Sequence, residues 1–352
     1  MKKKILFFLP SSTGGAERMT ITIAKMLNRE LYDVKFVIVQ RTLGSIMGFI
    51  PKGYEIIHIP VHNIWCFSTL RMYRIIKKEK AQIVFSSICY LNPRTIVAAK
   101  MASVKVIIRD SLNILAERYL TQILMKATYP MADKIITQQD EMRVELLKII
   151  PKLEKECVIT LQNPIDIETI NEKIKHTTNP FPADGSVNYV WVGRYSEQKA
   201  QDVLVKALNM LLETNAKSHV YFIGKYDFTN KYDYSIKQYV EENGLTEHVH
   251  FIGFDYNPYR WVKFCDCFVM PSRTEGLPNA LLEAMYLERP VVASCCLPII
   301  ERIVDDGKNG YKVPVDCPKL MAEAMAKAIL LKNCSMTYKP ASKDDFVRQF
   351  EC

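Results

Sequence analysis

Short runs rich in valine, isoleucine and phenylalanine alternate with amphipathic helical stretches along the whole chain. This alternation is typical of parallel α/β sheets, because a helix that covers the sheet connects each buried strand to the next. The chain has 352 residues, which is more than one hydrophobic core usually organises. We therefore expect two doubly wound α/β domains, with ligands bound in a cleft at the carboxyl ends of the strands.

The expected first domain covers residues 1–170. Its strands are expected at 4–9, 34–40, 54–59, 82–86, 104–109, 134–137 and 157–161. Its helices are expected near 16–28, 68–79, 93–101, 116–127 and 141–149. Residues 171–187 lack a strong period and carry Pro180, Pro182 and Gly185, so they are expected as a linker.

The expected second domain covers residues 188–335. Its strands are expected at 189–193, 219–223, 249–253, 267–270 and 290–293. Its helices are expected near 200–213, 235–242, 278–287 and 319–331. Residues 336–352 form a tail, and a helix that returns to the first domain is one interpretation of its short amphipathic sequence.

The composition excludes several classes of protein. Apolar residues make up 49% of the chain and charged residues 24%, which excludes a largely disordered, collagen-like or coiled-coil protein. No apolar run approaches the roughly 20 residues that a membrane-spanning helix needs. The ten cysteines lack zinc-finger spacing, and we expect them to be reduced thiols in a cytoplasmic protein.

The net charge of +9 is unevenly distributed. Residues 1–180 hold 27 lysines and arginines against 16 acidic residues, whereas residues 181–352 hold 20 against 22. No nucleic-acid-binding motif accompanies this charge, so we expect no nucleic acid partner and a peripheral contact between the first domain and an anionic membrane. The basic stretch 71–80 is one candidate for that contact, although a charged helix end explains it slightly better.

Gly14 and Gly15 follow the first expected strand and precede a helix. Glycines at such a turn let the backbone approach a ligand, and the helix N-terminus attracts phosphate. A plain tight turn is the simpler explanation of an isolated pair of glycines. The spacing does not match the Gly-x-Gly-x-x-Gly fingerprint, which argues against NAD binding.

Arg194 and Lys199 lie five residues apart in the loop after the first strand of the second domain. Both can point into the cleft, where two fixed cations would neutralise a diphosphate. Solvated surface charges are an equally good explanation of either residue alone.

Glu275 precedes a helix that is expected to begin near Leu277, and Glu283 lies inside that helix. The two carboxylates can reach different parts of one ligand: Glu275 the hydroxyls of a sugar, Glu283 a ribose diol. The apolar residues around Glu283 predict a largely buried helix, which argues against a purely solvated side chain there.

Four groups of residues carry a resemblance to a known family. They are Gly14-Gly15-Ala-Glu-Arg18, Asn163-Pro164-Ile-Asp166, Val192-Gly193-Arg194 with Lys199, and Glu275-Gly-Leu-Pro-x4-Glu283. Their order resembles that in glycosyltransferase family 4, from Lys4 to about Leu331. The resemblance implies the GT-B fold, in which two Rossmann-like domains face a cleft, and a sugar transfer that retains the anomeric configuration.

The resemblance also implies roles for individual residues. Arg194 and Lys199 would hold the diphosphate of a nucleotide sugar, Glu275 would contact its sugar, and these three residues would be catalytic. The residues implied in donor binding are Gly14, Gly15, Arg194, Lys199, Ile252, Gly253, Glu275, Gly276, Leu277, Pro278, Asn279 and Glu283. Arg109 would contact donor or acceptor.

The chain departs from the family pattern at two places. Ser294-Cys295-Cys296-Leu297 stands where many relatives have glycines, which leaves the identity of the sugar open, and Ala200 stands where glycine is common. No Asp-x-Asp pair follows a strand, so no bound metal is implied, and no cofactor is expected beyond the nucleotide sugar as co-substrate.

We therefore expect a metal-independent, retaining hexosyltransferase that uses a nucleotide sugar, with UDP preferred over GDP. The acceptor would be a hydroxyl of a lipid-linked or saccharide molecule, as in polysaccharide or glycolipid synthesis in the cytoplasm or at the inner face of its membrane. No convincing pair of carboxylates is present, so the departing phosphate is expected to take the acceptor's proton. The alternatives are a nucleotide-sugar 2-epimerase and a non-catalytic scaffold subunit of the same fold.

Overall fold

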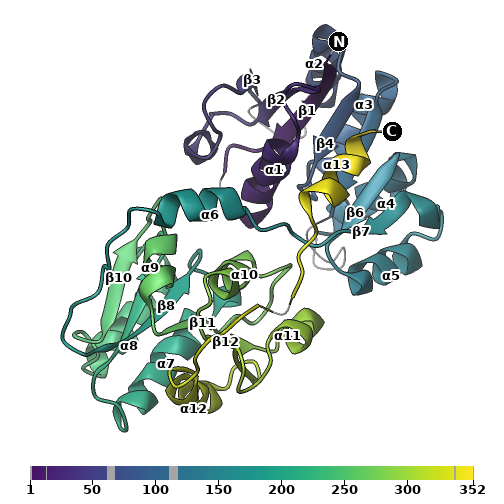
Figure 1. Ribbon diagram of the computed structural model, residues 1–352. Coiled ribbons are helices and arrows are strands. Elements are labelled where there is room, and N and C mark those ends of the chain that lie inside the picture. Colours follow the sequence, from purple (N-terminus) through teal and green to yellow (C-terminus); the bar gives the residue numbers. More distant parts are fainter. Residues whose placement is uncertain (1, 13, 62–67, 111–117, 337, 352) are drawn as a thin grey trace. The chain divides into compact units, whose positions relative to one another are not determined.

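The computed structural model describes residues 2–12, 14–61, 68–110, 118–336 and 338–351. The chain divides into two compact units: unit 1 is Met1–Pro164 with Pro340–Cys352, and unit 2 is Ile165–Lys339. Each unit contains one parallel β-sheet with helices on both faces (Figure 1). This confirms the expected class of two Rossmann-like α/β domains.

Unit 1 is built on a seven-stranded sheet with the order β3-β2-β1-β4-β5-β6-β7. Phe7 in β1 lies opposite Phe36 on one side and Phe85 on the other, and all three rings are buried. A parallel strand covered on both faces needs such a continuous apolar run. The strands are β1 (Lys3–Leu9), β2 (Tyr32–Val39), β3 (Glu55–Ile59), β4 (Ile83–Ser86), β5 (Lys105–Arg109), β6 (Lys134–Thr137) and β7 (Val158–Thr160).

The helices of unit 1 cover the two faces of this sheet. The helices are α1 (Gly15–Met26), α2 (Ser68–Glu79), α3 (Asn92–Met101), α4 (Tyr119–Thr128), α5 (Asp140–Ile149) and α13 (Lys343–Glu351), with single turns η1 (Ser45–Gly48), η3 (Tyr129–Met131) and η4 (Lys155–Cys157). Helices α2 to α5 bury Met72, Ile96, Met125 and Leu146 in one core. Helices α1 and α13 share the core on the opposite face.

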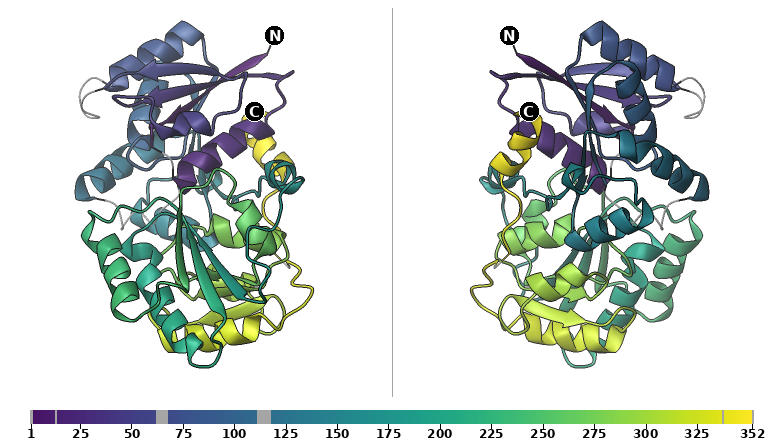
Figure 2. Two further views of the ribbon diagram at one scale, coloured as in Figure 1. Left: turned by 90° about the vertical axis from the view of Figure 1, so that its left-hand side faces the viewer. Right: turned by 90° about the vertical axis from the view of Figure 1, so that its right-hand side faces the viewer.

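The C-terminal helix α13 is part of unit 1. Its Phe346 and Phe350 are fully buried, and the Phe350 ring lies 5.9 Å from that of Phe7 and 5.7 Å from that of Phe85. In both views of Figure 2 this helix, in yellow, lies beside α1, in purple. The tail of the chain therefore completes the core on one face of the first sheet.

Unit 2 is built on a six-stranded parallel sheet with the order β10-β9-β8-β11-β12-β13. The strands are β8 (Val187–Val192), β9 (Ser218–Ile223), β10 (Val249–Gly253), β11 (Cys267–Met270), β12 (Val291–Ser294) and β13 (Gly310–Val313). The chain reverses its direction across the sheet between β10 and β11, so β8 and β11 are neighbours. The carboxyl ends of these two strands are the place where ligands bind in open sheets of this kind.

The helices of unit 2 also form two layers. The helices are α6 (Ile167–Ile174), α7 (Gln201–Leu212), α8 (Lys231–Glu242), α9 (Tyr259–Phe264), α10 (Asn279–Tyr286), α11 (Pro298–Ile303) and α12 (Pro318–Ala328), with the single turn η5 (Glu197–Lys199). Helices α7, α8 and α12 bury residues in one core, and α6, α9, α10 and α11 in the other.

The expected strands and helices occur within a few residues of their expected bounds. The sequence analysis missed three short α-helices and one strand. These are α6, α9, α11 and β13, each of which has too few residues to show a clear period. Helix α6 occupies part of the segment that was expected as a linker; Asp166 caps it by accepting a hydrogen bond from the Thr169 N–H at 3.2 Å. The two units meet between Pro164 and Ile165, before the expected end of the first domain at 170.

Two further expectations concern the membrane and the cysteines. Among the described residues we find no helix with the length and apolar character that a bilayer crossing requires. The cysteines for which the structure describes a thiol are all free, and four of them, Cys89, Cys265, Cys267 and Cys334, are buried.

Candidate functional site

Most of the expected site residues lie in unit 2, around the carboxyl ends of β8, β10 and β11. Those in unit 2 are Arg194, Lys199, Ile252, Gly253, Glu275, Gly276, Leu277, Pro278, Asn279 and Glu283. Gly14, Gly15 and Arg109 lie in unit 1. We describe each group within its own unit.

Lys199 and Glu275 form an ion pair at this edge of the second sheet. The Lys199 Nζ lies 2.7 Å from both carboxylate oxygens of Glu275, and the Ser272 hydroxyl donates to one of these oxygens at 2.7 Å. The Glu275 side chain is only 8% exposed, whereas that of Lys199 is 29% exposed. A carboxylate this buried needs its cation and its hydroxyl, so the fold holds both groups in one place.

Arg273 fixes the loop that carries Glu275 against the turn that carries Lys199. Its guanidinium donates to both carboxylate oxygens of Asp202, at 3.0 and 2.8 Å, to Asp316 at 2.7 Å and to the carbonyl of Glu197 at 2.7 Å. Such a bidentate contact restricts orientation as well as distance. The sequence analysis did not select Arg273, because its partners lie 43 to 76 residues away in the chain.

Ala200, next to Lys199, adopts a left-handed conformation with φ 52° and ψ 44°. Glycine is usual at such an angle, because a Cβ atom is strained there. This conformation ends η5 and begins α7, and the Gln201 side chain then donates to the Arg194 carbonyl at 3.2 Å. The Arg194 side chain itself is exposed.

Helix α10 begins at Asn279, two residues later than expected, with Pro278 as its N-cap. Gly276 and Asn279 are half-buried and Leu277 and Pro278 are buried; the Asn279 N–H already bonds the Leu277 carbonyl at 3.0 Å. Glu283 is half-buried on this helix and accepts a hydrogen bond from the Tyr259 hydroxyl at 3.4 Å. The helix is largely buried, as its apolar pattern predicted.

Ile252 and Gly253 form the end of β10. Gly253 has φ +81° and sits where the register with β9 shifts, and Ile252 is exposed. The Gly253 carbonyl accepts from the Gly224 N–H at 2.8 Å. Left-handed backbone at this position explains the glycine without a ligand.

The two cysteines of the altered loop after β12 face different carboxylates. Burial raises the pKa of the Cys296 thiol to about 11, and the negative charge of Glu275 adds to this rise. Burial also raises the pKa of Cys295 to about 11, with a further contribution from a hydrogen bond to Glu301. The charge of Glu275 thus acts on the Cys296 thiol, and that of Glu301 acts on the Cys295 thiol.

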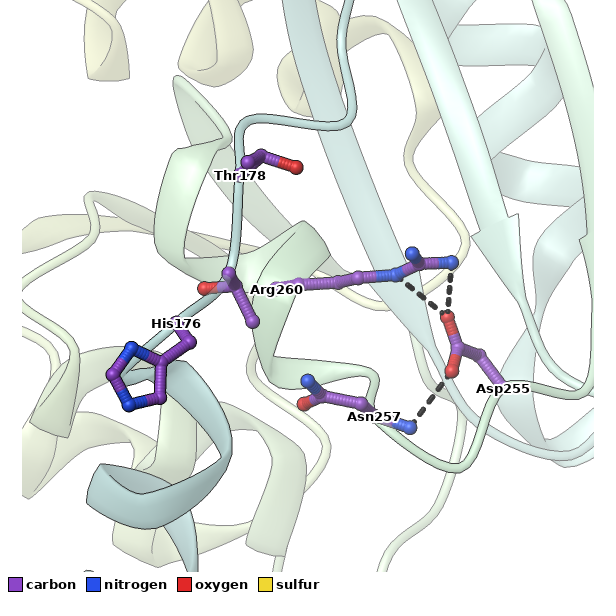
Figure 3. Close-up of a pocket in the computed structure, with 6 residues that line it drawn as sticks. His176, Thr178, Asp255, Asn257 and Arg260 are labelled. Atoms are coloured by element: carbon purple, nitrogen blue, oxygen red, sulfur yellow. Dashed lines mark hydrogen bonds and ion pairs between the residues drawn. The ribbon is translucent and has the colours of Figure 1, made fainter.

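A polar cavity of about 300 Å³ lies elsewhere in unit 2 and contains none of the expected site residues. Figure 3 shows the Arg260 guanidinium reaching the Asp255 carboxylate, while the side-chain amide of Asn257 points away from it. Asp255 accepts from the Asn257 N–H at 2.7 Å, from the Trp261 ring N–H at 2.9 Å and from the Arg260 guanidinium at 3.0 Å. Although burial opposes the change, these hydrogen bonds lower the pKa of Asp255. The donors to this carboxylate come from its own loop and from α9.

Gly14 and Gly15 form the turn between β1 and α1. Gly14 caps the helix in an extended conformation, and Gly15 is the exposed first residue of α1. The Glu17 carboxylate accepts from the Ser12 hydroxyl at 3.1 Å, and a Cβ at Gly14 would lie 2.6 Å from it. Glu17 thus covers Gly14, whereas the backbone of Gly15 is accessible.

Arg109 at the end of β5 is fully buried in unit 1. It donates to the side chain of Asn163, and its carbonyl accepts from the Asn92 amide at 3.2 Å. Burial lowers the pKa of Arg109 to about 10, although the charge of Asp110 opposes this. Its Nε and Nη1 find no hydrogen-bond partner in the part of unit 1 that the structure describes. The side chain joins β5 to Asn163, next to the last residue of the first segment of unit 1. Its expected contact with donor or acceptor stays a prediction.

Comparison with known proteins gives the class of protein. A family described as glycosyl transferases group 1 matches residues 186–330, which is the part of unit 2 that carries Lys199, Glu275 and Glu283. The capsular polysaccharide biosynthesis glycosyltransferase CapH of Staphylococcus aureus is 27% identical over 312 residues, 84% of this chain and 81% of that protein. These matches support a glycosyltransferase.

Two further similarities extend over nearly the whole chain. An N-acetylgalactosaminyltransferase of Campylobacter jejuni, named for a diphospho-undecaprenol acceptor, is 23% identical over 97% of this chain and 94% of its own. The crystal structure of Anabaena HepE in complex with UDP and glucose has a TM-score of 0.78 at 17% identity, over 99% of this chain and 98% of that one. The structural likeness shows the shared GT-B fold.

Proposed function

We propose that this glycosyltransferase moves a hexose from a UDP-sugar to a hydroxyl of a lipid-linked or saccharide acceptor, with retention of configuration and without a metal ion. The observation that carries the proposal is the Lys199–Glu275 pair at the carboxyl edge of the second sheet, beside the start of α10. A cation and a carboxylate held together there suit the two halves of a nucleotide sugar: a diphosphate and a ring with hydroxyls.

Lys199 can bind phosphate without leaving Glu275. An ammonium group has three N–H donors, and the two contacts to Glu275 leave one for a phosphate oxygen. The exposed guanidinium of Arg194 lies in the same loop after β8 as Lys199 and adds a second positive charge. Preorganised donors of this type contribute about 3–4 kcal/mol each to transition-state stabilisation. Under this proposal the two side chains do the electrostatic work that a metal does in other transferases.

Glu275 is the proposed contact to the transferred sugar. Its oxygens accept from Lys199 and Ser272, and a carboxylate has about four acceptor positions, so it can also accept from sugar hydroxyls. Glu283, about one turn into α10, is the proposed contact to the nucleotide ribose.

The proposed step breaks the bond between the sugar C1 and the β-phosphate oxygen and forms a bond from C1 to the acceptor oxygen on the same face. The proton of the acceptor hydroxyl passes to the departing phosphate, which leaves as UDP. Lys199 and Arg194 stabilise the negative charge that develops on that phosphate. No carboxylate nucleophile is required, in contrast to retaining hydrolases.

Two similarities support the donor and the acceptor. The UDP and glucose bound to HepE support a UDP-sugar, and the diphospho-undecaprenol in the name of the Campylobacter relative supports a lipid-linked acceptor. The relation to a capsular polysaccharide enzyme supports a role in the synthesis of a cell-surface polysaccharide.

The test begins with a panel of nucleotide sugars, among which thermal stabilisation of the protein identifies the donor. Sugar transfer from that donor is then measured for the wild type and for Lys199→Met, with and without EDTA. We expect wild-type transfer to persist in EDTA and kcat of the variant to fall about 100-fold or more. The variant should also lose about 1–2 kcal/mol of stability, because Glu275 keeps only Ser272 while Lys199 is partly exposed. Lys206→Met, which removes an exposed lysine of α7, is the matched control and should retain activity.

Other results would redirect the proposal. Normal turnover by Lys199→Met would remove Lys199 from the mechanism, and loss of activity in EDTA would contradict metal independence. Release of a free 2-epimerised sugar without an acceptor would indicate the epimerase. Failure of every nucleotide sugar to bind in calorimetry would indicate the scaffold subunit.

A further inference from the structure

The outer side of α4 exposes large apolar side chains. Tyr119 is 78% exposed, Leu120 55% and Ile123 44%. Positions 119 and 123 are four residues apart, so they lie one above the other on the helix surface, with Leu120 beside them. Among the helices of the described chain, α4 alone carries three large apolar residues of this exposure.

Tyr119, Leu120 and Ile123 do not lie on the side of α4 that packs against the core of unit 1. The inner side of α4 is occupied by Thr121, Met125 and Thr128, which are buried against the sheet of unit 1. Met125 belongs to the same core as Met72 of α2 and Ile96 of α3. The helix is thus anchored by one side, and its opposite side presents an apolar stripe to solvent.

The charged residues that the structure describes on α4 and at its N-cap are positive. Arg118 and Lys126 are exposed at its two ends, and no acidic residue occurs from 118 to 132. We define the α4 face as Tyr119, Leu120 and Ile123 with Arg118 and Lys126. A soluble protein rarely leaves such a surface without a partner, and cations beside it disfavour a basic partner.

The neighbouring helices extend this positive charge. Helix α3 packs against both α2 and α4, and Figure 1 labels all three in unit 1. Helix α2 exposes basic side chains, and its single acidic residue, Glu79, is paired with Lys35 at 2.8 Å. The exposed basic residues of α2 are Arg71, Arg74, Lys77 and Lys78. The layer of helices on this face of the sheet is therefore apolar at α4 and basic at both α2 and α4.

We propose that the α4 face docks unit 1 on the surface of an anionic lipid bilayer. Tyr119, Leu120 and Ile123 would enter the boundary between headgroups and acyl chains, where apolar and amphipathic side chains are favoured. Arg118 and Lys126 would lie among the lipid phosphates, as basic residues beside a membrane do. The surface is independent of the proposed sugar transfer, because none of its residues belongs to the Lys199–Glu275 site.

The experiment is sedimentation of the full chain with vesicles made of equal parts phosphatidylglycerol and phosphatidylcholine. We expect binding that weakens in high salt, and weak binding to pure phosphatidylcholine vesicles. Leu120→Gln/Ile123→Gln keeps helix propensity and removes apolar contact, and it should lower the partition coefficient about tenfold or more. Lys126→Gln should reduce binding to the anionic vesicles only.

The matched control is Met210→Gln/Leu320→Gln, which removes two similarly exposed apolar side chains from α7 and α12 of unit 2 and should bind vesicles like the wild type. Wild-type binding by Leu120→Gln/Ile123→Gln, or no binding by the wild type, would overturn the proposal. So would a concentration-dependent dimer without lipid that Leu120→Gln/Ile123→Gln abolishes, since the face would then join two copies of the chain. UDP-sugar binding by the variants, measured in parallel, separates this result from a failure of the proposed function.

Discussion

Gly193 and Gly224 lie at the ends of β8 and β9, where the backbone leaves no room for a Cβ atom at Gly224. The Gly193 N–H bonds the Ile223 carbonyl at 3.0 Å, and a Cβ at Gly224 would lie 1.8 Å from the Gly193 carbonyl oxygen. Backbone atoms cannot move aside as a flexible side chain can. The glycine at 224 is therefore required by the packing of two strands next to Arg194, and not by its own dihedral angles.

We expect Gly224→Ala to lower the free energy of unfolding by about 3 kcal/mol or more, because the new methyl group forces the two strand ends apart. Urea denaturation measures the change. Gly244→Ala is the control: Gly244 has φ +66° and no atom within 4 Å of its Cβ position, so only backbone strain of about 1 kcal/mol applies. Equal losses in the two variants would mean that the close approach costs nothing.

Helix α13, at the end of the chain, packs on a sheet whose strands lie far away in the sequence. Lys3 donates to the carbonyls of Phe350 and Glu351 at 3.1 and 2.9 Å, and Lys134 donates to the Gln349 side chain at 2.8 Å. Cations at a helix C-terminus satisfy its last carbonyls and its negative dipole end. These lysines lie at the beginnings of β1 and β6, so the end of the helix is held at the amino edge of the sheet.

We expect Phe350→Ala to destabilise unit 1 by about 3–4 kcal/mol, since a fully buried ring between Phe7 and Phe85 would leave a cavity. Differential scanning calorimetry would report the change as a lower transition temperature. Arg348→Ala, an exposed position on the same helix, should leave that temperature within error of the wild type. A small effect of Phe350→Ala would show that α13 contributes little to the core.

On the scale of the whole molecule, each unit has its own pair of hydrophobic cores. In unit 2, His219 of β9 and His250 of β10 approach to 3.0 Å between ring nitrogens. Burial lowers the pKa of both below the ordinary 6.5; the charge of His248 adds to the effect on His219, and the charge of His219 to that on His250. Asp184 and Glu247 oppose the shifts.

Because the folded unit binds these protons less tightly than the unfolded chain, its stability should be complete above about pH 6.5 and fall below that value. We expect calorimetry to show a loss of stability in unit 2 as the pH falls below about 6.5. His219→Gln/His250→Gln should flatten this dependence. A double variant that keeps the wild-type slope would assign the pH effect to other groups.

Much of the fold could be predicted from local sequence, because a continuous apolar run predicts a buried parallel strand. β6 and β10, for example, have the bounds that their residues predict. Helices α6, α9 and α11 were not predicted, because six to eight residues span too few turns to show a hydrophobic period. The family resemblance predicted the residues of the candidate site, whereas a motif cannot say which residues touch.

The sequence alone determined the class of fold, the order of its elements and the residue types near the carboxyl edge of each sheet, since these depend on neighbours along the chain. Only the tertiary structure decided that Lys199 neutralises Glu275, that Arg273 anchors their loops, and that Arg109 is buried while α4 is apolar on its outer side. Such pairings join residues far apart in the chain, and their energies depend on burial and distance, which a linear pattern does not contain.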